Sequence, residues 1–180
     1  MAFEYLAYGT DKQLHPRVRS DGSTEYVVSP YQMAAREGKY YLICNFDKYD
    51  DISNYRMDRI RGIRILDQRA KPFESLQGAD GRRLDLADYM KKHAYMFSSG
   101  NCRAVFRVSR SMIGDMIDLF GKDVVFSDET EEAVTASVYT NEMSAAHFAR
   151  SLAPDVTVLQ PERLRETVKG QLRQALEKYE

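Results

Sequence analysis

Tyrosine and arginine side chains are concentrated in one stretch of the chain, where Tyr40, Tyr41, Tyr55, Arg56 and Arg59 lie within twenty residues. A guanidinium binds a phosphate through two parallel hydrogen bonds, and an aromatic ring stacks on a nucleobase. A groove that presents both groups is therefore suited to a nucleic acid or a nucleotide. The alternative stays open that Arg56 pairs with a nearby aspartate while the tyrosines fill a hydrophobic core.

The expected strands limit which of these side chains can share a groove, because neighbours in a strand point to opposite faces. Of Tyr40 and Tyr41, one faces inward and the other outward, and the alternation of the sequence does not decide which. Upstream, Ser29 and Tyr31 are two residues apart, so they share a face. We expect the serine hydroxyl to add a hydrogen-bond donor to the groove.

Other kinds of chemistry have little support in the sequence. The three histidines, His15, His93 and His147, have no partner at metal-ligand spacing, and Cys44 follows an apolar run that is typical of a core strand. Phosphate-loop, dinucleotide-binding and serine-hydrolase motifs are absent from the sequence. No residue is predicted to be catalytic or to hold a metal or a cofactor, and Asp58 is the only acid near the groove.

Composition and charge set the class of protein. The chain has 180 residues, 43% of them hydrophobic, and a net charge of -1, so no overall basic field attracts it to nucleic acid. The charge is uneven, however: residues 1–72 carry 12 basic and 10 acidic side chains, whereas residues 73–180 carry 14 and 17. Two distant cysteines, no signal peptide and no long apolar run predict a cytoplasmic protein without disulfides or a membrane span.

The first part of the sequence predicts a small β-barrel. Short strands are expected over residues 3–8, up to Pro16, over 26–35, over 39–46, from about residue 54 and over 63–67, with too little chain between them for a helix. A single tight turn between Arg56 and Arg59 would bring both guanidiniums to one side. Strands that end in this way are typical of SH3-like and Sm-like barrels. Residues 69–100, which contain Pro72 and Gly78, are predicted to be a linker with a short helix.

The last eighty residues predict a second domain over 101–180, of the ferredoxin-like type. Strands alternate with helices in the order β-α-β-β-α-β, followed by a terminal helix. The fold class is therefore mixed α/β (α+β). Particular signals are a helix N-cap at Asn141, a helix stop at Gly121, and a helix start at Pro161. The inward positions are expected to be Cys102, Ala104, Phe106 and Val108 on one strand, Val134, Ala136 and Val138 on another, and Leu164, Val168, Leu172, Leu176 and Tyr179 on the last helix.

The order of the motifs resembles the WYL domain of bacterial transcriptional regulators. Tyr40-Tyr41-Leu42 stands where that family has its naming Trp-Tyr-Leu triplet, and Tyr55-Arg56-Met57-Asp58-Arg59-Ile60 matches its aromatic-Arg-x-x-Arg-Ile stretch. The part from about residue 97 onward is similar to the C-terminal WCX-type extension that follows many WYL domains, through its Phe-Gly, Pro-Glu-x-Leu-Arg and terminal Tyr. This resemblance covers nearly the whole chain.

The resemblance implies a sensor or regulatory module that binds nucleic acid, often single-stranded, or a nucleotide-like effector. The matched ligand-binding candidates are Ser29, Tyr31, Tyr41, Arg56 and Arg59. Regulators of this family usually bind promoter DNA through an N-terminal helix-turn-helix, which this sequence does not contain. We therefore expect a fragment of a longer regulator, which contacts promoter DNA only through that missing segment, and we expect a homodimer.

The sequence is compatible with four functions. The leading one is a ligand-sensing part of a transcriptional regulator, in which the ligand favours one arrangement of the two domains. The second is a constitutive module for single-stranded nucleic acid, which would show strong salt dependence and no change of shape. The third is an enzyme acting on a nucleotide, with Asp58 as its acid or base. The fourth is a dimerisation unit without a ligand, based on the apolar helices of the second domain.

Overall fold

The computed structural model describes residues 1–77, 79, 81, 83–98 and 100–179. Contacts within the chain divide it into two compact units, Met1–Leu86 and Ala87–Glu180. The fold is mixed α/β: the first unit is built on a curled sheet, and the second on a sheet with helices. Each unit is described by itself below.

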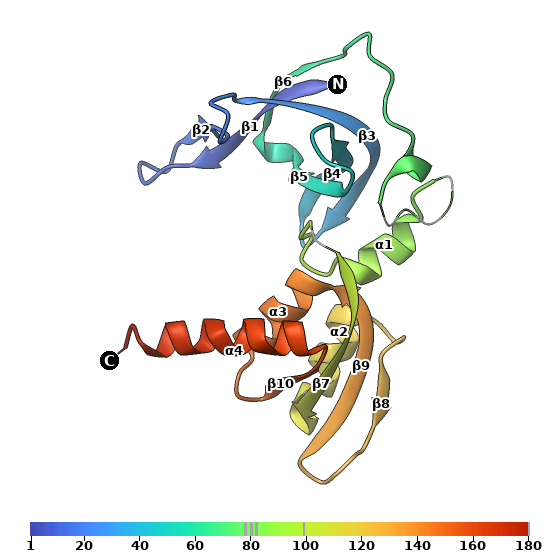
Figure 1. Ribbon diagram of the computed structural model, residues 1–180, viewed down its shortest axis with the longest axis vertical. Coiled ribbons are helices and arrows are strands. Elements are labelled where there is room, and N and C mark those ends of the chain that lie inside the picture. The colour runs from blue at the N-terminus through green and yellow to red at the C-terminus, as the bar shows by residue number, and fades with distance from the viewer. Residues whose placement is uncertain (78, 80, 82, 99, 180) are drawn as a thin grey trace. The chain divides into compact units, whose positions relative to one another are not determined.

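The first unit consists of six strands that form one curled sheet (Figure 1). The strands are β1 (Ala2–Tyr8), β2 (Leu14–Pro16), β3 (Glu25–Arg36), β4 (Lys39–Phe46), β5 (Ile52–Arg56) and β6 (Ile60–Arg64). They pair in the order β2-β1-β3-β4-β5, and β6 pairs with β1. The single-turn helix η1 (Met57–Arg59) joins β5 to β6, so the chain that leaves β5 returns at once to pair with β1.

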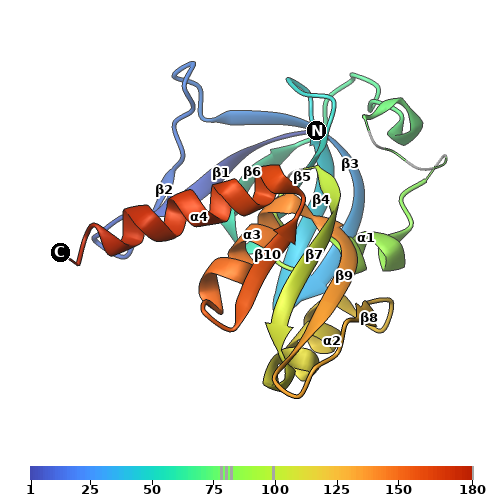
Figure 2. The ribbon, with the colours of Figure 1, turned by 60° about the horizontal axis from the view of Figure 1, so that its bottom comes forward.

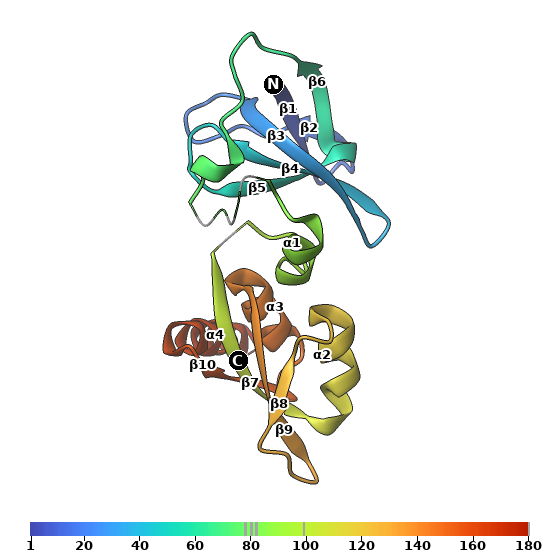
Figure 3. The same cartoon turned by 90° about the vertical axis from the view of Figure 1, so that its right-hand side faces the viewer.

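Local sequence explains the long hairpin of β3 and β4, which Figure 3 shows as the two longest strands of this unit. The two loop residues, Glu37 and Gly38, both have positive φ, 50° and 70°. A two-residue turn with this conformation matches the right-handed twist of the strands it connects. Glycine at the second position adopts it without a Cβ penalty.

An aromatic-rich core fills the inside of the curled sheet. Its buried members are Phe3, Tyr26, Val28, Leu42, Cys44 and Phe46. The rings of Phe3, Tyr5 and Tyr26 all lie edge-on to the ring of Tyr55, with centroids 5.0–5.4 Å apart. Edge-to-face pairs at these distances are favourable beyond their buried area. Tyr55, at the start of the matched aromatic-Arg stretch, is therefore a core residue.

The opposite face of the hairpin is also partly covered. On β4 this face carries Tyr41, Ile43 and Asn45, because side chains alternate along a strand. Ile43 and Asn45 are fully buried, as is most of the neighbouring Ser29 on β3. The register of the two strands shifts between Pro30 and Gln32, so a β-bulge sets the direction of Tyr31.

Residues 71–77 lie against this second face, and we call them the strap. The strap contains the single-turn helix η2 (Phe73–Ser75), and its Phe73 and Leu76 are buried. The ring of Phe73 packs edge-on against Tyr31, with centroids 5.5 Å apart. At its far end the backbone N–H of Gln77 donates to the carbonyl of Asp50 at 2.7 Å. This part of the segment expected to be a linker is therefore packed on the first unit.

The second unit has a four-stranded antiparallel sheet in the order β10-β7-β9-β8. Its elements are α1 (Leu86–Lys92), β7 (Asn101–Ser109), η3 (Arg110–Met112), α2 (Ile113–Phe120), β8 (Val125–Ser127), β9 (Ala133–Asn141), α3 (Glu142–Ser151), β10 (Val156–Gln160) and α4 (Glu162–Leu176). From β7 to β10 the strands and α-helices follow the predicted β-α-β-β-α-β order. In Figures 1 and 2, α4 lies beside α3 and β10.

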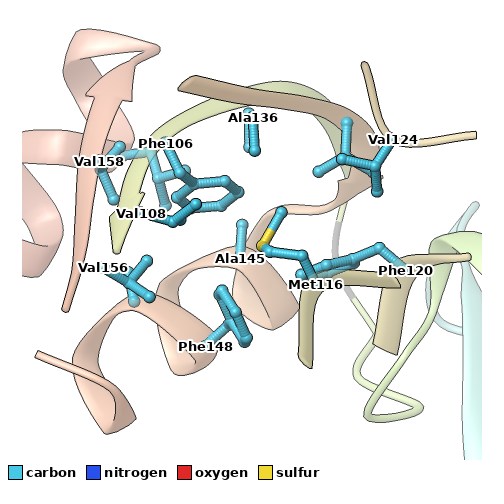
Figure 4. Packing of buried hydrophobic residues seen from close by; sticks show 14 of the residues in the cluster. Phe106, Val108, Met116, Phe120, Val124, Ala136, Ala145, Phe148, Val156 and Val158 are labelled. Atoms are coloured by element: carbon cyan, nitrogen blue, oxygen red, sulfur yellow. The ribbon is translucent and has the colours of Figure 1, made fainter. Parts of the chain in front are cut away.

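The core of the second unit lies between one face of this sheet and the helices. Figure 4 shows Phe106 and Val108 of β7 directed toward Ala145 and Phe148 of α3, with Met116 of α2 beside them. The predicted inward positions Ala104, Phe106 and Val108 on β7 and Val134, Ala136 and Val138 on β9 are all buried, as expected from their alternation. The same alternation points the remaining side chains of both strands away from the helices.

The helix ends follow the predicted chemistry. The side chain of Asn141 accepts a hydrogen bond from the backbone N–H of Ser144 at 3.1 Å, as an N-cap should. Helix α2 ends at Gly121, whose φ of 85° is one that glycine adopts most easily. The apolar stripe of α4 is buried only at Leu164 and Val168, whereas Leu172, Leu176 and Tyr179 are exposed.

Both ends of the last strand of the first unit differ from the prediction of residues 63–67. The last strand of the first unit is Ile60–Arg64, three residues earlier than predicted, and Ile65 is 85% exposed. The strand begins directly after η1 because β6 must pair with β1, and pairing with β1 places Ile60 opposite Tyr5. Local β-propensity placed the strand on the last apolar residues instead, and tertiary pairing overrides it.

Candidate functional site

Three of the five predicted ligand-binding residues lie around η1. Tyr41 of β4 is the cross-strand partner of Arg56 at the end of β5, and Arg59 ends η1 three residues later. Tyr8, from the end of β1, lies under the guanidinium of Arg59, with 5.7 Å between that group and the ring centroid. We call Tyr8, Tyr41, Arg56, Asp58 and Arg59 the η1 surface.

Arg56 is held in a fixed direction by Asp58. Its Nε donates to Oδ1 of Asp58 at 3.0 Å and its Nη2 donates to Oδ2 at 2.6 Å, so the pair is bidentate. The hydrogen bond from Arg56 keeps the pKa of Asp58 below its ordinary value, and the same bond raises the pKa of Arg56. The backbone N–H of Arg56 also donates to the hydroxyl of Tyr5 at 3.2 Å. The aspartate pairing that the sequence left open is thus present.

The guanidinium of Arg59 has a hydrogen-bond donor without an acceptor among the described residues. Its Nε is buried, and among the residues that the structure describes no atom accepts a hydrogen bond from it. A buried donor without a partner costs free energy, about 1–3 kcal/mol. The cation-π contact with Tyr8 offsets part of this cost but leaves the donor open. Because the Nε is hidden from solvent, an anionic ligand accepts from it only if the Arg59 side chain turns outward.

The structure also shows how Tyr40 and Tyr41 are placed. Leu42 is in the core, and Tyr40 shares its face, but β4 runs past the core at this end and Tyr40 is 66% exposed. Tyr41 is half-buried on the other face, beside Arg56. Of these two tyrosines, Tyr41 is therefore the one that lies beside Arg56.

Ser29 and Tyr31 lie elsewhere on the same sheet. Ser29 pairs with Asn45, which is four residues from Tyr41 along β4, or roughly 13 Å at the rise of a strand. The Ser29 hydroxyl accepts a hydrogen bond from the backbone N–H of Lys71 at 2.8 Å, and the Tyr31 hydroxyl donates to the carbonyl of Lys71 at 2.9 Å. Burial raises the pKa of Tyr31 to about 12. Both hydroxyls therefore hold the strap.

A groove of about 600 Å³ opens beside Tyr31. It is lined by residues of β3, the strap and the segment before α1, namely Pro30, Tyr31, Gln32, Ala70, Lys71, Pro72, Phe73, Arg83 and Leu84. The Lys71 ammonium is bound to the Asp50 carboxylate at 2.5 Å, on the loop between β4 and β5. The groove is large enough for a small molecule.

Sequence reasoning did not find Tyr8, Lys71 or Arg83. Tyr8 is 51 residues from Arg59 and reaches it only because β6 returns to pair with β1. Lys71 and Arg83 lie in a segment whose composition is that of a linker. No periodicity marks them, so tertiary structure alone brings them to the sheet.

Metal binding and membrane insertion gain no support from the described residues. Among them, no group of three or more His, Cys, Asp or Glu side chains could hold a metal ion. Within the same part of the chain, every helix is too short or too polar to cross a bilayer.

The fold and the η1 surface define a two-unit α/β protein with an arginine-tyrosine surface on a curled sheet. The family model of the WYL domain matches residues 3–65, and that of the WCX domain matches residues 100–176. The chain therefore belongs to the proteins in which a WYL domain is followed by a WCX domain, and the resemblance seen in its motifs is confirmed.

Among solved structures, the chain is similar to proteasome accessory factor B/C (PafBC) of Arthrobacter aurescens, with 15% identity over 99% of this chain and 25% of that one, and a TM-score of 0.40. It is also similar to a CRISPR Cas-related protein, with 14% identity over 99% of this chain and 47% of that one, and a TM-score of 0.49. The chain thus spans a quarter and about half of their lengths. No curated protein matches the sequence.

Proposed function

We propose that this chain is the ligand-sensing regulatory part of a transcriptional regulator and binds a nucleic acid or nucleotide-like ligand on its first unit. The observation that carries the proposal is the η1 surface, where Tyr41 pairs with Arg56 across the strands, Arg59 follows three residues later, and one buried donor of Arg59 has no acceptor among the described residues. Guanidiniums next to exposed rings are suited to hold phosphate and stack a base.

Each side chain of the η1 surface has a proposed role. The Arg59 side chain turns so that its unpaired Nε donates to a phosphate oxygen, and Arg56 presents a guanidinium already aligned by Asp58. A phosphate that approaches Arg56 shares it with Asp58 or displaces that carboxylate. The ring of Tyr41, or that of Tyr8, stacks on a base. A charge-assisted hydrogen bond of this kind contributes about 1.5–3 kcal/mol.

Ser29 and Tyr31 have a place in the same proposal. They lie on the sheet that carries the η1 surface, and their hydroxyls hold the strap. A ligand long enough to reach the groove beside Tyr31 competes with Lys71 for both hydroxyls and loosens the strap. Because the strap precedes the second unit in the chain, its release is the proposed way in which binding shifts the population of the regulator.

The proposal includes the fold type of each unit. We infer that the first unit is an Sm/SH3-like barrel, since η1 leads the chain from β5 into β6, which pairs with β1. We infer a ferredoxin-like second unit from its strand order β10-β7-β9-β8. The proposed domain limits are residues 1–68 for the barrel, 69–100 for the linker and 101–180 for the ferredoxin-like domain. We propose further that the protein is a cytoplasmic homodimer. Promoter DNA would be contacted only through a segment outside this sequence.

The test is fluorescence anisotropy with a labelled single-stranded oligonucleotide and a panel of nucleotides. Arg56→Ala should weaken binding about 10- to 100-fold, the equivalent of one charge-assisted hydrogen bond. Arg64→Ala is the matched control: Arg64 is exposed, pairs with Glu25, and lies at the opposite end of β1 from Tyr8. Equal affinities for wild type and Arg56→Ala would refute the assignment.

A constitutive module for single-stranded nucleic acid is the second candidate, because the same guanidiniums and rings of the η1 surface would serve it. Both candidates predict binding that weakens as salt increases. They differ in the strap, because a sensor must change on binding and a constitutive module does not. Faster amide exchange at Lys71 in the bound state supports the sensor, and unchanged exchange supports the constitutive module.

A further inference from the structure

The second unit presents one face of its sheet away from the helices. On β7 the side chains of this outer face are Arg103, Val105 and Arg107, and on β9 they are Thr135, Ser137 and Tyr139, since the alternate positions fill the core. The register places Arg103 opposite Tyr139, Val105 opposite Ser137, and Arg107 opposite Thr135. Two arginines, three hydroxyls and one ring thus lie on the two central strands.

Neither arginine is neutralised by a carboxylate within the described residues. Arg103 donates through Nη1 to the hydroxyl of Ser137 at 3.3 Å. Arg107 donates to the carbonyl of Asp128 at 2.6 Å and to the hydroxyls of Thr130 and Thr135. These neutral acceptors direct both guanidiniums across the sheet and leave their charge free to attract an anion.

The net charge of this face is positive, whereas that of the second unit as a whole is negative. Residues 87–180 carry 14 acidic and 12 basic side chains, yet no outward position of β7, β8, β9 or β10 is acidic. Carboxylates do border the face: Asp88 pairs with Lys92, Asp123 pairs with Lys91, and Asp128 follows β8 and accepts from Arg107 through its backbone carbonyl. A positive strip on an acidic unit is the charge pattern that a phosphate backbone recognises.

Tyr139 gives the strip a stacking platform. Its ring is 51% exposed although it lies on a central strand. The ammonium of Lys92, at the end of α1, lies 5.4 Å from the centroid of the Tyr139 ring. Arg103 is the cross-strand neighbour of Tyr139. A hollow of about 190 Å³ borders this ring, and its charged lining consists of Lys91, Lys92 and Arg103 together with Asp88 and Asp123. The ring is therefore flanked by cations and open to solvent.

We propose that the outer face of β7 and β9 binds a segment of single-stranded nucleic acid. Arg103 and Arg107 contact successive phosphates, Tyr139 stacks on a base, and Ser137 and Thr135 donate hydrogen bonds. Four-stranded sheets with rings on their central strands are a known architecture for stacking unpaired bases. A protein partner fits less well, because the apolar residues of the face, Val105, Val125 and Leu159, are separated by polar ones.

This inference goes beyond the proposed function, since it adds a second site on a different unit. Its test is the anisotropy of a labelled single-stranded oligonucleotide of about 12 nucleotides, as DNA and as RNA, with the full chain. Arg103→Ala/Arg107→Ala is measured in the wild-type chain and in the Arg56→Ala chain, so that binding at the η1 surface does not mask the sheet. Each lost phosphate contact lowers the salt slope by about 0.7 for single strands.

The expected result is that Arg103→Ala/Arg107→Ala weakens binding by about 10-fold or more and reduces the salt slope by about 1.4. Arg165→Ala/Arg173→Ala is the matched control, because it removes the same charge from exposed positions of α4. Arg103→Lys/Arg107→Lys should keep the slope. If either arginine pair unfolds the chain, Tyr139→Ser, with Tyr139→Phe as its control, tests the same face through stacking, with an expected loss of about 5- to 100-fold.

Four outcomes are informative. Binding that survives Arg56→Ala and is lost with Arg103→Ala/Arg107→Ala supports the sheet site and separates it from the η1 surface. Equal effects of the sheet pair and the α4 pair overturn the sheet site, whatever Arg56→Ala does. Complete loss with Arg56→Ala alone overturns it too, while supporting the proposed function. No binding by the wild-type chain overturns both.

Discussion

Arg56 and Asp58 form an ion pair that acts as an internal competitor at the η1 surface. Two hydrogen bonds join them, yet the Asp58 side chain is 56% exposed and the Arg56 side chain 23%. Exposed pairs contribute little to stability, typically less than about 1 kcal/mol. An entering phosphate therefore meets a guanidinium that is correctly aligned but partly neutralised, and the carboxylate repels it.

Replacing Asp58 should consequently strengthen binding of an anionic ligand. Asp58→Asn removes the repulsion between the carboxylate and the ligand and frees the guanidinium of Arg56 from its ion pair. We therefore expect the affinity for the labelled oligonucleotide or nucleotide to rise about 2- to 10-fold. Isothermal titration calorimetry at low and moderate salt measures the change. Asp21→Asn, which removes a carboxylate that pairs with Arg19 away from η1, is the control. A loss of affinity in Asp58→Asn would mean that Asp58 positions Arg56 for the ligand instead of competing with it.

His93 couples the stability of the second unit to pH. It is 6% exposed and stacks on Tyr89, and its Nδ1 lies 3.0 Å from the Tyr89 carbonyl, to which it donates. Burial is the largest cause that lowers its pKa, and the charge of Lys92 lowers it further, while the hydrogen bond to Tyr89 and the charge of Asp88 oppose them. The folded state therefore favours the neutral imidazole.

The sign of the pH effect follows from linkage. Below about pH 6.5 the unfolded chain takes up a proton that the folded His93 resists, so the free energy of unfolding should fall as the pH falls from 7 to 5.5. His93→Gln should remove this slope, whereas His15→Gln, at an exposed position, should keep it. Urea unfolding at several pH values provides the measurement. A slope that persists in His93→Gln would assign it to another group.

At the scale of elements, the strap is held by groups that the family motif assigned to a ligand. Ser29 is 6% exposed, and its hydroxyl accepts a hydrogen bond from the backbone N–H of Lys71. Ser29→Ala leaves that amide without its acceptor, which costs about 1–3 kcal/mol. The strap should therefore open more often in this variant.

Hydrogen exchange measures this opening. In Ser29→Ala, the amides of Lys71 and Gln77 should exchange about 5- to 100-fold faster, while the core strands β3 and β4 change less. Ser75→Ala is the matched control, because its exposed hydroxyl only donates to the carbonyl of Pro72 within η2. Equal exchange in the two serine variants would show that Phe73 and Leu76 alone hold the strap.

Elements with a regular period were predictable from sequence. The alternation on β7 and β9, the N-cap at Asn141 and the stop at Gly121 all appear where the pattern placed them. The period on α4 predicted a stripe but not its extent, since Leu172 and Leu176 are exposed. A repeated apolar position marks an amphipathic face, and only the length of the neighbouring elements decides how much of it is covered.

The candidate site was less predictable than the elements. The motif named Tyr41, Arg56 and Arg59, but nothing local indicates Tyr8, which β6 brings to η1 by pairing with β1. The two-residue spacing of Ser29 and Tyr31 did predict a shared side, since both hydroxyls reach Lys71, but it did not indicate the bulge between Pro30 and Gln32 or the strap. The strap has only Phe73 and Leu76 as apolar residues, which is too few for a periodic signal.

At the scale of the molecule, the chain has two separate hydrophobic cores. One cluster joins Phe3 to Phe46 within the first unit, and the other joins Phe106 to Phe148 within the second. Phe3 and Phe148 are each 1% exposed, and each contacts rings of its own cluster. The same substitution at these two positions therefore creates a comparable cavity in either core.

This symmetry allows the cooperativity of the two units to be measured. Phe3→Ala and Phe148→Ala should each cost about 3–5 kcal/mol, because a buried phenyl ring is lost and a cavity remains. If the units open independently, Phe148→Ala accelerates the slowest amides of β7 and β9 by more than about 100-fold and leaves those of β3 and β4 unchanged, and Phe3→Ala does the reverse. Acceleration of both sets by either variant would mean that the units unfold as one, and a ligand on the first unit would then stabilise the second by mass action without any change in the strap.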